Sequence, residues 1–446
     1  MIRWRWWQDP NVPAGAGSSY VFDSSASEFI SAVYDTSNNK LVVAYSDNGT
    51  SGYGTAVVGT VSGSVITFGT PVIYQSANVG DANDIVYDSS NNKVVVLYRN
   101  AQTSARASVG TVSGTSISFG TASTFVAGWI EDITSVFDTN ANKIVIFFRD
   151  RTNALGGAIV GTVSGTSISF GSVSNFDQYW AAFDSVFDSS QNTAVLAYRK
   201  TSDNSGNIIA GQVSGTSITL GSETTFDTSA IGSSSISLTF DSSENKCVVF
   251  FGDSTDGLQS KVITVTGTSV AAGDSVVFDP SSGDTTAVYD PSSGKHIVFF
   301  RDASEGAFGS VVTGIVSGTT ISFTAADTAI TGGQVDWLGS AYDSDNEKAI
   351  FCFEDGGNSN YGTALAYTPS ASNLSAQNFI GISDGAYSDA ATAKVQIVGS
   401  VDDAQSGLTA GQAYYVQNDG TLSTTAGDPS VFAGTAVSAT KLIVKG

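Results

Sequence analysis

Aromatic residues lie next to carboxylates in several polar segments of this chain. The combination occurs at Trp129, Glu131, Asp132, Tyr179, Trp180, Asp336 and Trp337, and Phe29 beside Glu28 is similar. An aromatic ring can stack on the C–H face of a sugar, while a carboxylate accepts hydrogen bonds from sugar hydroxyls. These segments therefore predict a carbohydrate-binding surface, and the alternative is that the rings fill gaps inside the fold.

Other chemistries have little support in the residue types. The single histidine, His296, lies in an apolar segment, so neither a Ser-His-Asp site nor a histidine metal site is expected. The run Asp343–Glu347 resembles the start of a calcium loop but lacks the glycine and the distant glutamate of that motif. We predict no metal, no cofactor and no catalytic residue. Glycoside hydrolysis by paired carboxylates stays open as an alternative, because Asp and Glu number 41.

The elements that must carry these segments belong to a repeated unit, of which Ser135–Asp150 is a clear copy. Its first arm ends in Phe137 and Asp138, a polar turn follows, and the second arm is apolar throughout Ile144–Phe148. A continuous apolar run bounded by turn residues predicts a strand covered on both faces. The unit is therefore predicted to be a β-hairpin whose second strand is sandwiched between neighbouring sheets.

The aspartate of this hairpin recurs seven times, each time after Tyr or Phe, and we call it the marker aspartate. The copies are Asp35, Asp88, Asp138, Asp188, Asp241, Asp290 and Asp343, spaced by 49 to 53 residues. An aspartate at the head of a turn accepts hydrogen bonds from nearby backbone N–H groups, so the marker is predicted to be structural. Lys follows five residues later in six copies, and Arg follows eleven residues later in four. These cations are predicted to be solvated strand ends or links between units.

Two further strands follow each hairpin. The third copy continues through Gly156–Gly171, two β-rich runs joined by a turn at Ser164 and Gly165, and other copies have a glycine at the same turn. Each copy is thus a four-stranded antiparallel sheet, and seven sheets of about 50 residues can be arranged radially. The predicted fold class is all-β: a seven-bladed β-propeller followed by a small C-terminal β-domain.

The ends of the chain set the predicted domain boundaries. Residues 1–17, which begin with the Trp-rich run MIRWRWWQ, are expected to be a tail or linker, 18–370 the propeller, and 371–446 the C-terminal domain. The seventh copy lacks the glycine turn and a fourth strand, whereas Ser18–Asp23 resembles the ends of other fourth strands. We expect this N-terminal strand to complete the last blade, because closing the ring removes open sheet edges.

Composition argues against several classes of partner. The formal net charge of −22 disfavours nucleic acid, whose binding depends on Lys and Arg. The sequence contains no apolar run of transmembrane length and no apolar core of a secretory signal at its start, so neither membrane insertion nor a signal peptide is expected. Cys247 and Cys352 lie in apolar arms and are predicted to be buried free thiols.

The C-terminal segment Asn378–Gly446 resembles a module of tail-fibre-like virion proteins of marine bacteriophages, particularly those of cyanobacteria. The segments YDSSNNKVVVLYRN (Tyr87–Asn100) and GTVSGTSISFG (Gly110–Gly120) are similar to the repeats that precede this module in such proteins. Together the resemblance covers nearly the whole chain after Ser18. It implies synthesis in the host cytoplasm, a place in the virion tail or fibre, and contact with the host surface.

The resemblance and the aromatic segments together lead to one expectation of function. The protein is expected to be a phage fibre or adhesin component that contacts other virion tail proteins. It would bind a host-surface glycan or lipopolysaccharide weakly and multivalently. The alternatives are a structural spacer of the tail apparatus and a propeller glycoside hydrolase or depolymerase.

Overall fold

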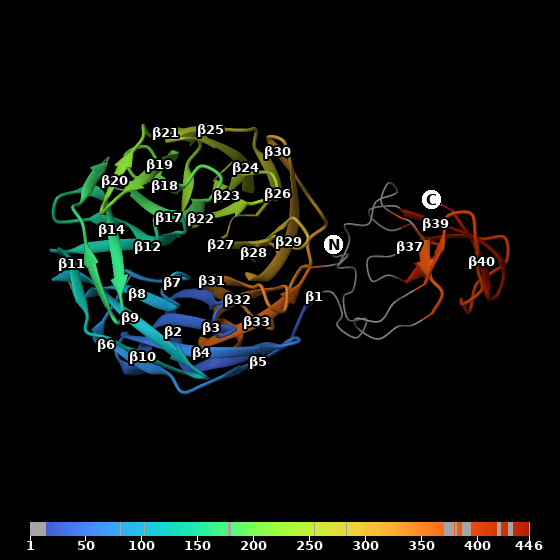
Figure 1. The fold of residues 1–446 in the computed structure, drawn as a ribbon, viewed down its shortest axis with the longest axis horizontal. Coiled ribbons are helices and arrows are strands. Elements are labelled where there is room, and N and C mark those ends of the chain that lie inside the picture. The colour runs from blue at the N-terminus through green and yellow to red at the C-terminus, as the bar shows by residue number, and fades with distance from the viewer. Residues whose placement is uncertain are drawn as a thin grey trace. The chain divides into compact units, whose positions relative to one another are not determined.

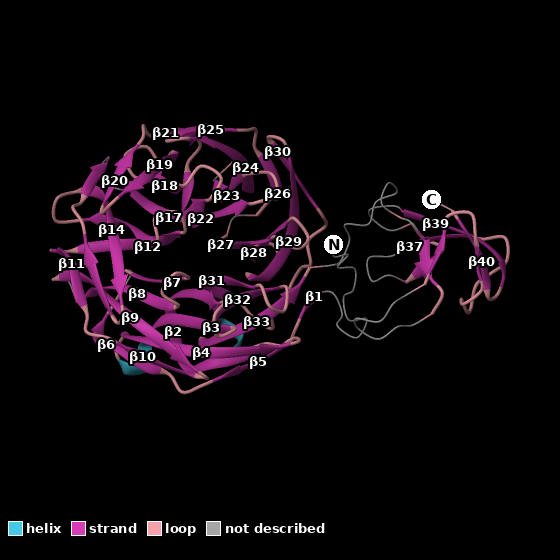
Figure 2. Cartoon of the chain, in the orientation of Figure 1, coloured by secondary structure: helices cyan, strands magenta, loops and turns pink. Residues whose placement is uncertain are grey.

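A computed structural model gives the fold of the chain (Figure 1). It describes residues 15–80, 82–101, 103–176, 180–253, 255–281, 283–369, 379, 381–385, 394–416, 421–426 and 431–445. The larger of its two compact units is Ala16–Tyr367, and the smaller contains Thr368–Gly446. Regular structure in the described residues is almost entirely β, apart from the short 3-10 helices η1 (Asn48–Thr50) and η2 (Gly356–Asn358) (Figure 2). The predicted all-β fold is confirmed, and the Trp-rich start of the chain lies outside the described residues.

The larger unit is a series of antiparallel meanders, whose strands we number first to fourth from the inside outward; the last meander has only the first three of its own. The first strands are β2 (Tyr20–Asp35), β7 (Asn83–Asp88), β12 (Ile130–Asp138), β17 (Trp180–Asp188), β22 (Ile231–Asp241), β27 (Thr285–Asp290) and β31 (Val335–Asp343). The second strands are β3 (Lys40–Asp47), β8 (Lys93–Asn100), β13 (Lys143–Asp150), β18 (Thr193–Lys200), β23 (Lys246–Asp253), β28 (Lys295–Asp302) and β32 (Lys348–Asp355). The third strands are β4 (Tyr53–Ser62), β9 (Ser104–Ser113), β14 (Leu155–Ser164), β19 (Gly206–Ser214), β24 (Gly257–Thr266), β29 (Phe308–Ser317) and β33 (Tyr361–Thr368).

The outermost strand is divided into two pieces in most repeats, and both pieces pair with the third strand. The fourth strands are β5 (Val65–Phe68), β10 (Ser116–Phe119), β15 (Ser167–Phe170), β20 (Ser217–Leu220), β25 (Ser269–Ala272) and β30 (Thr320–Phe323). The second pieces are β6 (Val72–Asn78), β11 (Ser123–Ala127), β16 (Ser174–Phe176), β21 (Thr224–Asp227) and β26 (Val276–Asp279). A glycine follows the fourth strand directly in five repeats, at Gly69, Gly120, Gly171, Gly221 and Gly273. It lies against the backbone of the next repeat, so the outer edges of neighbouring sheets come close together at the break.

The second strand of each repeat is the centre of the packing. Ile146 of β13 belongs to a cluster with Leu97 of the preceding repeat, whereas Phe147 belongs to a cluster with Leu196 of the following one. All four side chains are fully buried. Successive side chains of a strand point to opposite faces, so each second strand is covered on both sides. The predicted sandwiched strand is confirmed, and the predicted buried free thiols of the two cysteines are confirmed as well.

The marker aspartates are confirmed as turn residues. Asp138 Oδ1 accepts hydrogen bonds from the backbone N–H groups of Asn140 (2.9 Å) and Ala141 (2.8 Å). The other six markers accept the same two bonds. Asn142 then adopts a left-handed φ of 54°, which asparagine tolerates better than most residues. This turn sets where the first strand ends and the second begins.

The first and last repeats are joined by β2, which has 16 residues. Its first part pairs with β33, with Tyr20 opposite Ala364, and its last part pairs with β3, with Asp35 opposite Lys40. The short strand β1 (Gly15–Ala16) also pairs with β33. The two repeats therefore share one nine-stranded sheet.

The first strands surround the centre of the larger unit, which forms a ring (Figure 1). Each first strand contacts the first strand of the next repeat, and β31 contacts β2. The arrangement is propeller-like, and it holds the starts of the first strands at one rim. We call this the loop rim; it also carries the connections from second to third strands.

The smaller unit contains two antiparallel sheets in its described residues. One pairs β34 (Gly381–Ser383) with β35 (Val395–Ile397), and the other has the strand order β36-β40-β39-β37-β38. The bounds of the latter strands are β36 (Val401–Asp402), β37 (Ala413–Val416), β38 (Leu422–Ser423), β39 (Val431–Ser438) and β40 (Lys441–Val444). Leu408, Tyr414 and Leu442 contribute to its core. Across the described residues of the whole chain, no helix is long and apolar enough to cross a membrane.

Candidate functional site

Those predicted binding residues that the structure describes lie at the loop rim, where a β-bulge distorts the first strand of several repeats. The register shifts between Glu131 and Ile133 in one repeat and between Asp336 and Gly339 in the last. Four residues at the equivalent point, six before the marker, have left-handed φ: Phe29 (50°), Asp132 (48°), Ala182 (41°) and Trp337 (53°). Bulky residues rarely adopt this conformation, and it concentrates at functional sites.

Trp129, Glu131 and Asp132 are brought together, but with arginines as their partners. Glu131 is only 3% exposed and accepts hydrogen bonds from both Arg149 and Arg151. Arg149 Nε lies 3.2 Å from Asp132 Oδ2, and the Arg151 guanidinium lies 4.3 Å from the centre of a Trp129 ring. The two carboxylates are thus ion-paired and a face of Trp129 is covered. The sequence did not indicate these pairings, although Arg149 is one of the repeated arginines.

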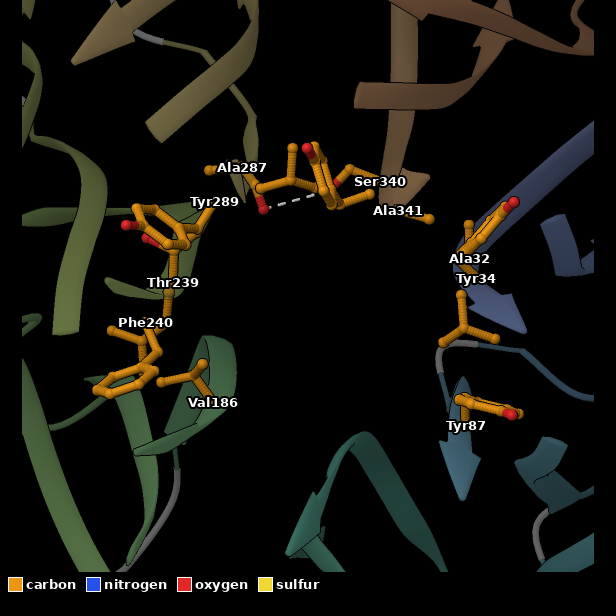
Figure 3. A pocket seen from close by; sticks show the side chains of 14 residues that line it. Ala32, Tyr34, Tyr87, Val186, Thr239, Phe240, Ala287, Tyr289, Ser340 and Ala341 are labelled. Carbon is orange, nitrogen blue, oxygen red and sulfur yellow. Dashed lines mark hydrogen bonds between the residues drawn. The ribbon is translucent and has the colours of Figure 1, made fainter. Parts of the chain in front are cut away.

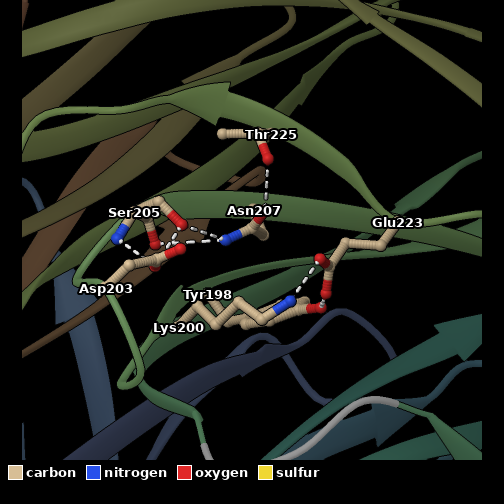
Figure 4. Close-up of polar contacts among 7 residues, drawn as sticks. All are labelled: Tyr198, Lys200, Asp203, Ser205, Asn207, Glu223 and Thr225. Atoms are coloured by element: carbon tan, nitrogen blue, oxygen red, sulfur yellow. Dashed lines mark hydrogen bonds and ion pairs between the residues drawn. The ribbon is translucent and has the colours of Figure 1, made fainter.

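Tyr179 lies outside the described residues, and of Trp180 the structure describes the backbone, which opens β17 opposite Lys200. The same repeat contains a polar network that the sequence did not indicate (Figure 4). Tyr198 and Lys200 both bind the carboxylate of Glu223, the latter at 2.8 Å. Glu223 immediately precedes β21, so these bonds tie the second strand to the outer edge of the same sheet.

Asp336 and Trp337 meet Glu28 and Phe29 where the last repeat contacts the first. The rings of Phe29 and Trp337 have centroids 4.1 Å apart, and Trp337 is 39% exposed. Asp336 lies opposite Glu354 in the β31–β32 ladder. We call Glu28, Phe29, Asp336, Trp337 and Glu354 the seam patch. It is the described part of the loop rim where an exposed tryptophan stands beside carboxylates.

The seam patch is electrostatically strained. Burial, reinforced by the charges of Glu28 and Asp336, raises the pKa of Glu354 to about 7. Arg301 from the preceding repeat approaches Asp336, with Nε 3.4 Å from Oδ1. Arg301 therefore pairs with Asp336, while burial, and after it the charges of Glu28 and Asp336, disfavour the ionised form of Glu354.

A cavity of about 360 Å³ lies at the centre of the ring, toward the marker turns (Figure 3). It is lined by residues just before the markers, including Tyr34, Tyr87, Phe240, Tyr289 and Tyr342. The hydroxyl of Tyr342 donates to Asp290 (2.5 Å), and that of Tyr289 donates to Ser243 (3.1 Å). Because these hydroxyls bind the turn of the preceding repeat, the cavity walls serve to join repeats, and we place the candidate site at the loop rim instead.

Hydrogen bonds between first strands form a belt around this centre. Asp84 Oδ1 accepts from Ser31 (2.8 Å) and Oδ2 accepts from Ser135 (2.6 Å), so one side chain links three repeats. The belt continues through Thr134–Ser185 (2.7 Å), Asp184–Leu238 N–H (2.8 Å), Ser237–Ala287 N–H (3.0 Å) and Thr286–Ser340 (2.6 Å). Burial raises the pKa of Asp84 to about 6 and that of Asp184 to about 7.

The belt makes stability depend on pH. A carboxyl whose folded pKa is raised from about 3.9 to about 6 stabilises the fold fully below pH 4, and this contribution is lost as pH rises through 6. In Asp84→Asn the amide oxygen can accept from one serine hydroxyl and the amide NH2 can donate to the other, so both contacts persist without a charge. We therefore expect Asp84→Asn to match the parent near pH 4.5. At pH 8 it should be more stable by on the order of 1 kcal/mol, after screening by water in the centre of the ring.

Urea unfolding at pH 4.5 and pH 8 measures this difference, with Asp256→Asn, at an exposed position, as the control. A variant whose stability relative to the parent is the same at both pH values would contradict the raised pKa of Asp84.

His296 is a core residue, in agreement with its apolar strand. It is fully buried, its Nδ1 lies 2.8 Å from Thr239 Oγ1, and its Nε2 lies 3.4 Å from Asp241 Oδ2. Burial lowers its pKa, so the ring is held neutral between two repeats. Thr239, Asp241 and His296 thus form a structural bridge, and no substrate reaches the imidazole.

Solved structures of low sequence identity resemble the chain, and such a resemblance bears on its fold alone. No family model matches the chain, and no curated protein matches it significantly. A solved chain of the mitotic checkpoint complex has 9% identity and a TM-score of 0.54, covering 82% of this chain and 96% of that one. The SapL1 lectin in complex with alpha methyl fucoside has 15% identity and a TM-score of 0.43 over 72% and 99% of the two chains. The intramolecular trans-sialidase from Ruminococcus gnavus has 9% identity and a TM-score of 0.47 over 78% and 97%.

Proposed function

We propose that Ala16–Tyr367 is a seven-bladed β-propeller and that the protein is a phage virion fibre component that attaches to host-surface glycans. The blade number is supported by seven marker turns and by the cycle of contacts in which β31 meets β2. A location in the virion, in contact with other tail proteins, is supported by a resemblance to tail-fibre-like virion proteins. Asn378–Gly446 and the repeats carry this resemblance. The C-terminal segment 371–446 is proposed as a separate module.

The observation that carries glycan binding is the exposed Trp337 against Phe29 at the loop rim, flanked by carboxylates. Loops on a rigid scaffold are where binding residues concentrate. The Trp129 cluster is a weaker candidate in the described conformation, because Arg151 covers its ring and Arg149 engages its carboxylates. Among the described residues, the exposed tryptophan of the seam patch therefore offers a glycan an accessible aromatic surface.

Trp337→Ala is expected to weaken binding to host cells or isolated lipopolysaccharide about threefold to tenfold per site, since one stacked ring contributes about 0.5–1.5 kcal/mol beyond its buried area. Its melting temperature should stay close to that of the parent, because the side chain is 39% exposed. Sedimentation of protein with host cells measures binding. Trp129→Ala is the matched control: it should keep most binding. Parent-level binding by Trp337→Ala would overturn the seam patch as the glycan site.

A glycoside hydrolase is the second candidate function. It is favoured because two carboxylic acids, Asp336 and Glu354, lie opposite each other in the ladder. The raised pKa of Glu354 suits a general acid. Release of reducing sugar from host polysaccharide, abolished by Glu354→Gln, would establish hydrolysis. Binding without release supports the adhesin.

A further inference from the structure

We propose that the seam patch binds an organic ammonium group, of the kind an amino sugar with a free amine carries. This rests on the proposed glycan binding and names the class of sugar. The sugar ring would lie on Trp337 while its ammonium group faces Glu354.

The first support is the state of Glu354. The residue is only 7% exposed, and no hydrogen bond or ion pair to its carboxylate is found among the described residues. Its carboxylate oxygens do not belong to the fully buried polar atoms that lack a partner, so they reach solvent and a ligand. Buried carboxylates are ordinarily paired, because an uncompensated buried charge is costly. Glu131, which is 3% exposed, follows that rule with two arginines. Glu354 therefore lacks a cation that a ligand can supply.

The repeats show where this deficit comes from. Eleven residues after the marker, the third copy has Arg149, which neutralises Glu131 across the ladder. The last copy has Glu354 at the same point, opposite Asp336. A cation of the repeat pattern has thus been replaced by an anion beside another anion. Arg301, which belongs to the neighbouring repeat, pairs with Asp336. This ion pair does not neutralise the charges of Glu28 and Glu354.

The patch favours an organic cation over a metal ion. Among the described residues, no three carboxylate, histidine or cysteine side chains come together as a metal-binding group. The patch also has an aromatic component, the Phe29 and Trp337 rings, whose faces attract cations such as ammonium groups. A bare ion would use only the carboxylates, whereas an ammonium on a carbon ring uses both parts of the patch.

The experiment compares two sugars that differ in whether the amino group of each ring is free or acetylated. The trisaccharide of glucosamine and the trisaccharide of N-acetylglucosamine are titrated by calorimetry into the full chain at pH 7, in parallel with calcium. We expect the free amine to bind at least tenfold more tightly than the acetylated sugar. Glu354→Gln should abolish that preference, and Trp337→Ala should weaken both sugars. Glu244→Gln, an exposed glutamate in a marker turn, is the charge-matched control and should keep the preference.

Four outcomes would overturn the proposal: no preference for the free amine, a preference that survives in Glu354→Gln, displacement of the glucosamine trisaccharide by calcium, or no binding of either sugar to the parent. Equal, Trp337-dependent binding of both sugars would remove the ammonium inference and leave glycan binding standing. Loss of the preference in Glu354→Gln without a fall in melting temperature would support a direct role, because a loss that came from damage to the fold would lower that temperature.

Discussion

Removal of residues 1–23 is expected to make the protein aggregate or to lower its melting temperature by about 10 °C or more, whereas removal of residues 1–14 should have little effect. The longer deletion takes away β1 and the part of β2 that pairs with β33. It exposes the edge of β33 and the apolar surface beneath, and unpaired edges invite association. A loss of several kcal/mol corresponds to a shift of this size.

The shorter deletion is the control because the described contacts begin at residue 15. Gly15–Ala16 pairs with β33, and the Gly17 N–H donates to the Ala366 carbonyl at 2.8 Å. Scanning calorimetry and light scattering measure both truncations. If they melt together, the N-terminal strand does not hold the ring closed.

A point substitution tests the same seam without changing chain length. Phe22 is 5% exposed, and its ring lies 5.1 Å from that of Tyr45 and 5.7 Å from that of Phe68. Phe22→Ala is expected to cost about 3–5 kcal/mol, as is usual for a buried phenylalanine. Val21→Ala, at a neighbouring position that is 44% exposed, should cost less than about 0.5 kcal/mol.

The repeat fold was accessible from sequence because its signals are local. The marker turn needs only an aspartate and the backbone of the next three residues, as at Asp138, and the sandwiched strand needs only an unbroken apolar run such as Ile144–Phe148. The sequence also indicated that Trp129, Glu131 and Asp132 lie close together, since they are neighbours in the chain. What they contact was not accessible, because Arg149 and Arg151 arrive through strand register and a loop.

The seam patch, too, could be predicted only in part from the sequence. Asp336 and Trp337 were recognised as an aromatic beside a carboxylate, and Phe29 beside Glu28 likewise. Their meeting depends on ring closure, which places residues about 300 positions apart in contact. Glu354 was visible as a departure from the repeated arginine. Its importance appears only in the fold, where the ladder places it opposite Asp336, another carboxylate.

The outer glycines repeat as regularly as the markers, but their role is set by the approach of two sheets. A Cβ at Gly171 would lie 1.8 Å from the carbonyl oxygen of Thr216 in the next repeat. The same approach, at 2.0 to 2.3 Å, occurs at Gly69, Gly120, Gly221 and Gly273. The opposing atom belongs to the main chain, so no change of rotamer relieves the contact. Neighbouring sheets would have to separate to admit even one methyl group.

Gly171→Ala is therefore expected to destabilise the larger unit by about 3 kcal/mol or more, at the upper end of the range for overpacking. The matched control is Gly165→Ala in the preceding turn, where φ is 62° and no atom lies within 4 Å of the added Cβ. That variant suffers only the backbone cost of a left-handed alanine, about 1 kcal/mol. Urea unfolding of both variants separates the two causes. Equal losses would mean that the close approach of the sheets is not needed for stability, and that Gly171 acts through chain conformation alone.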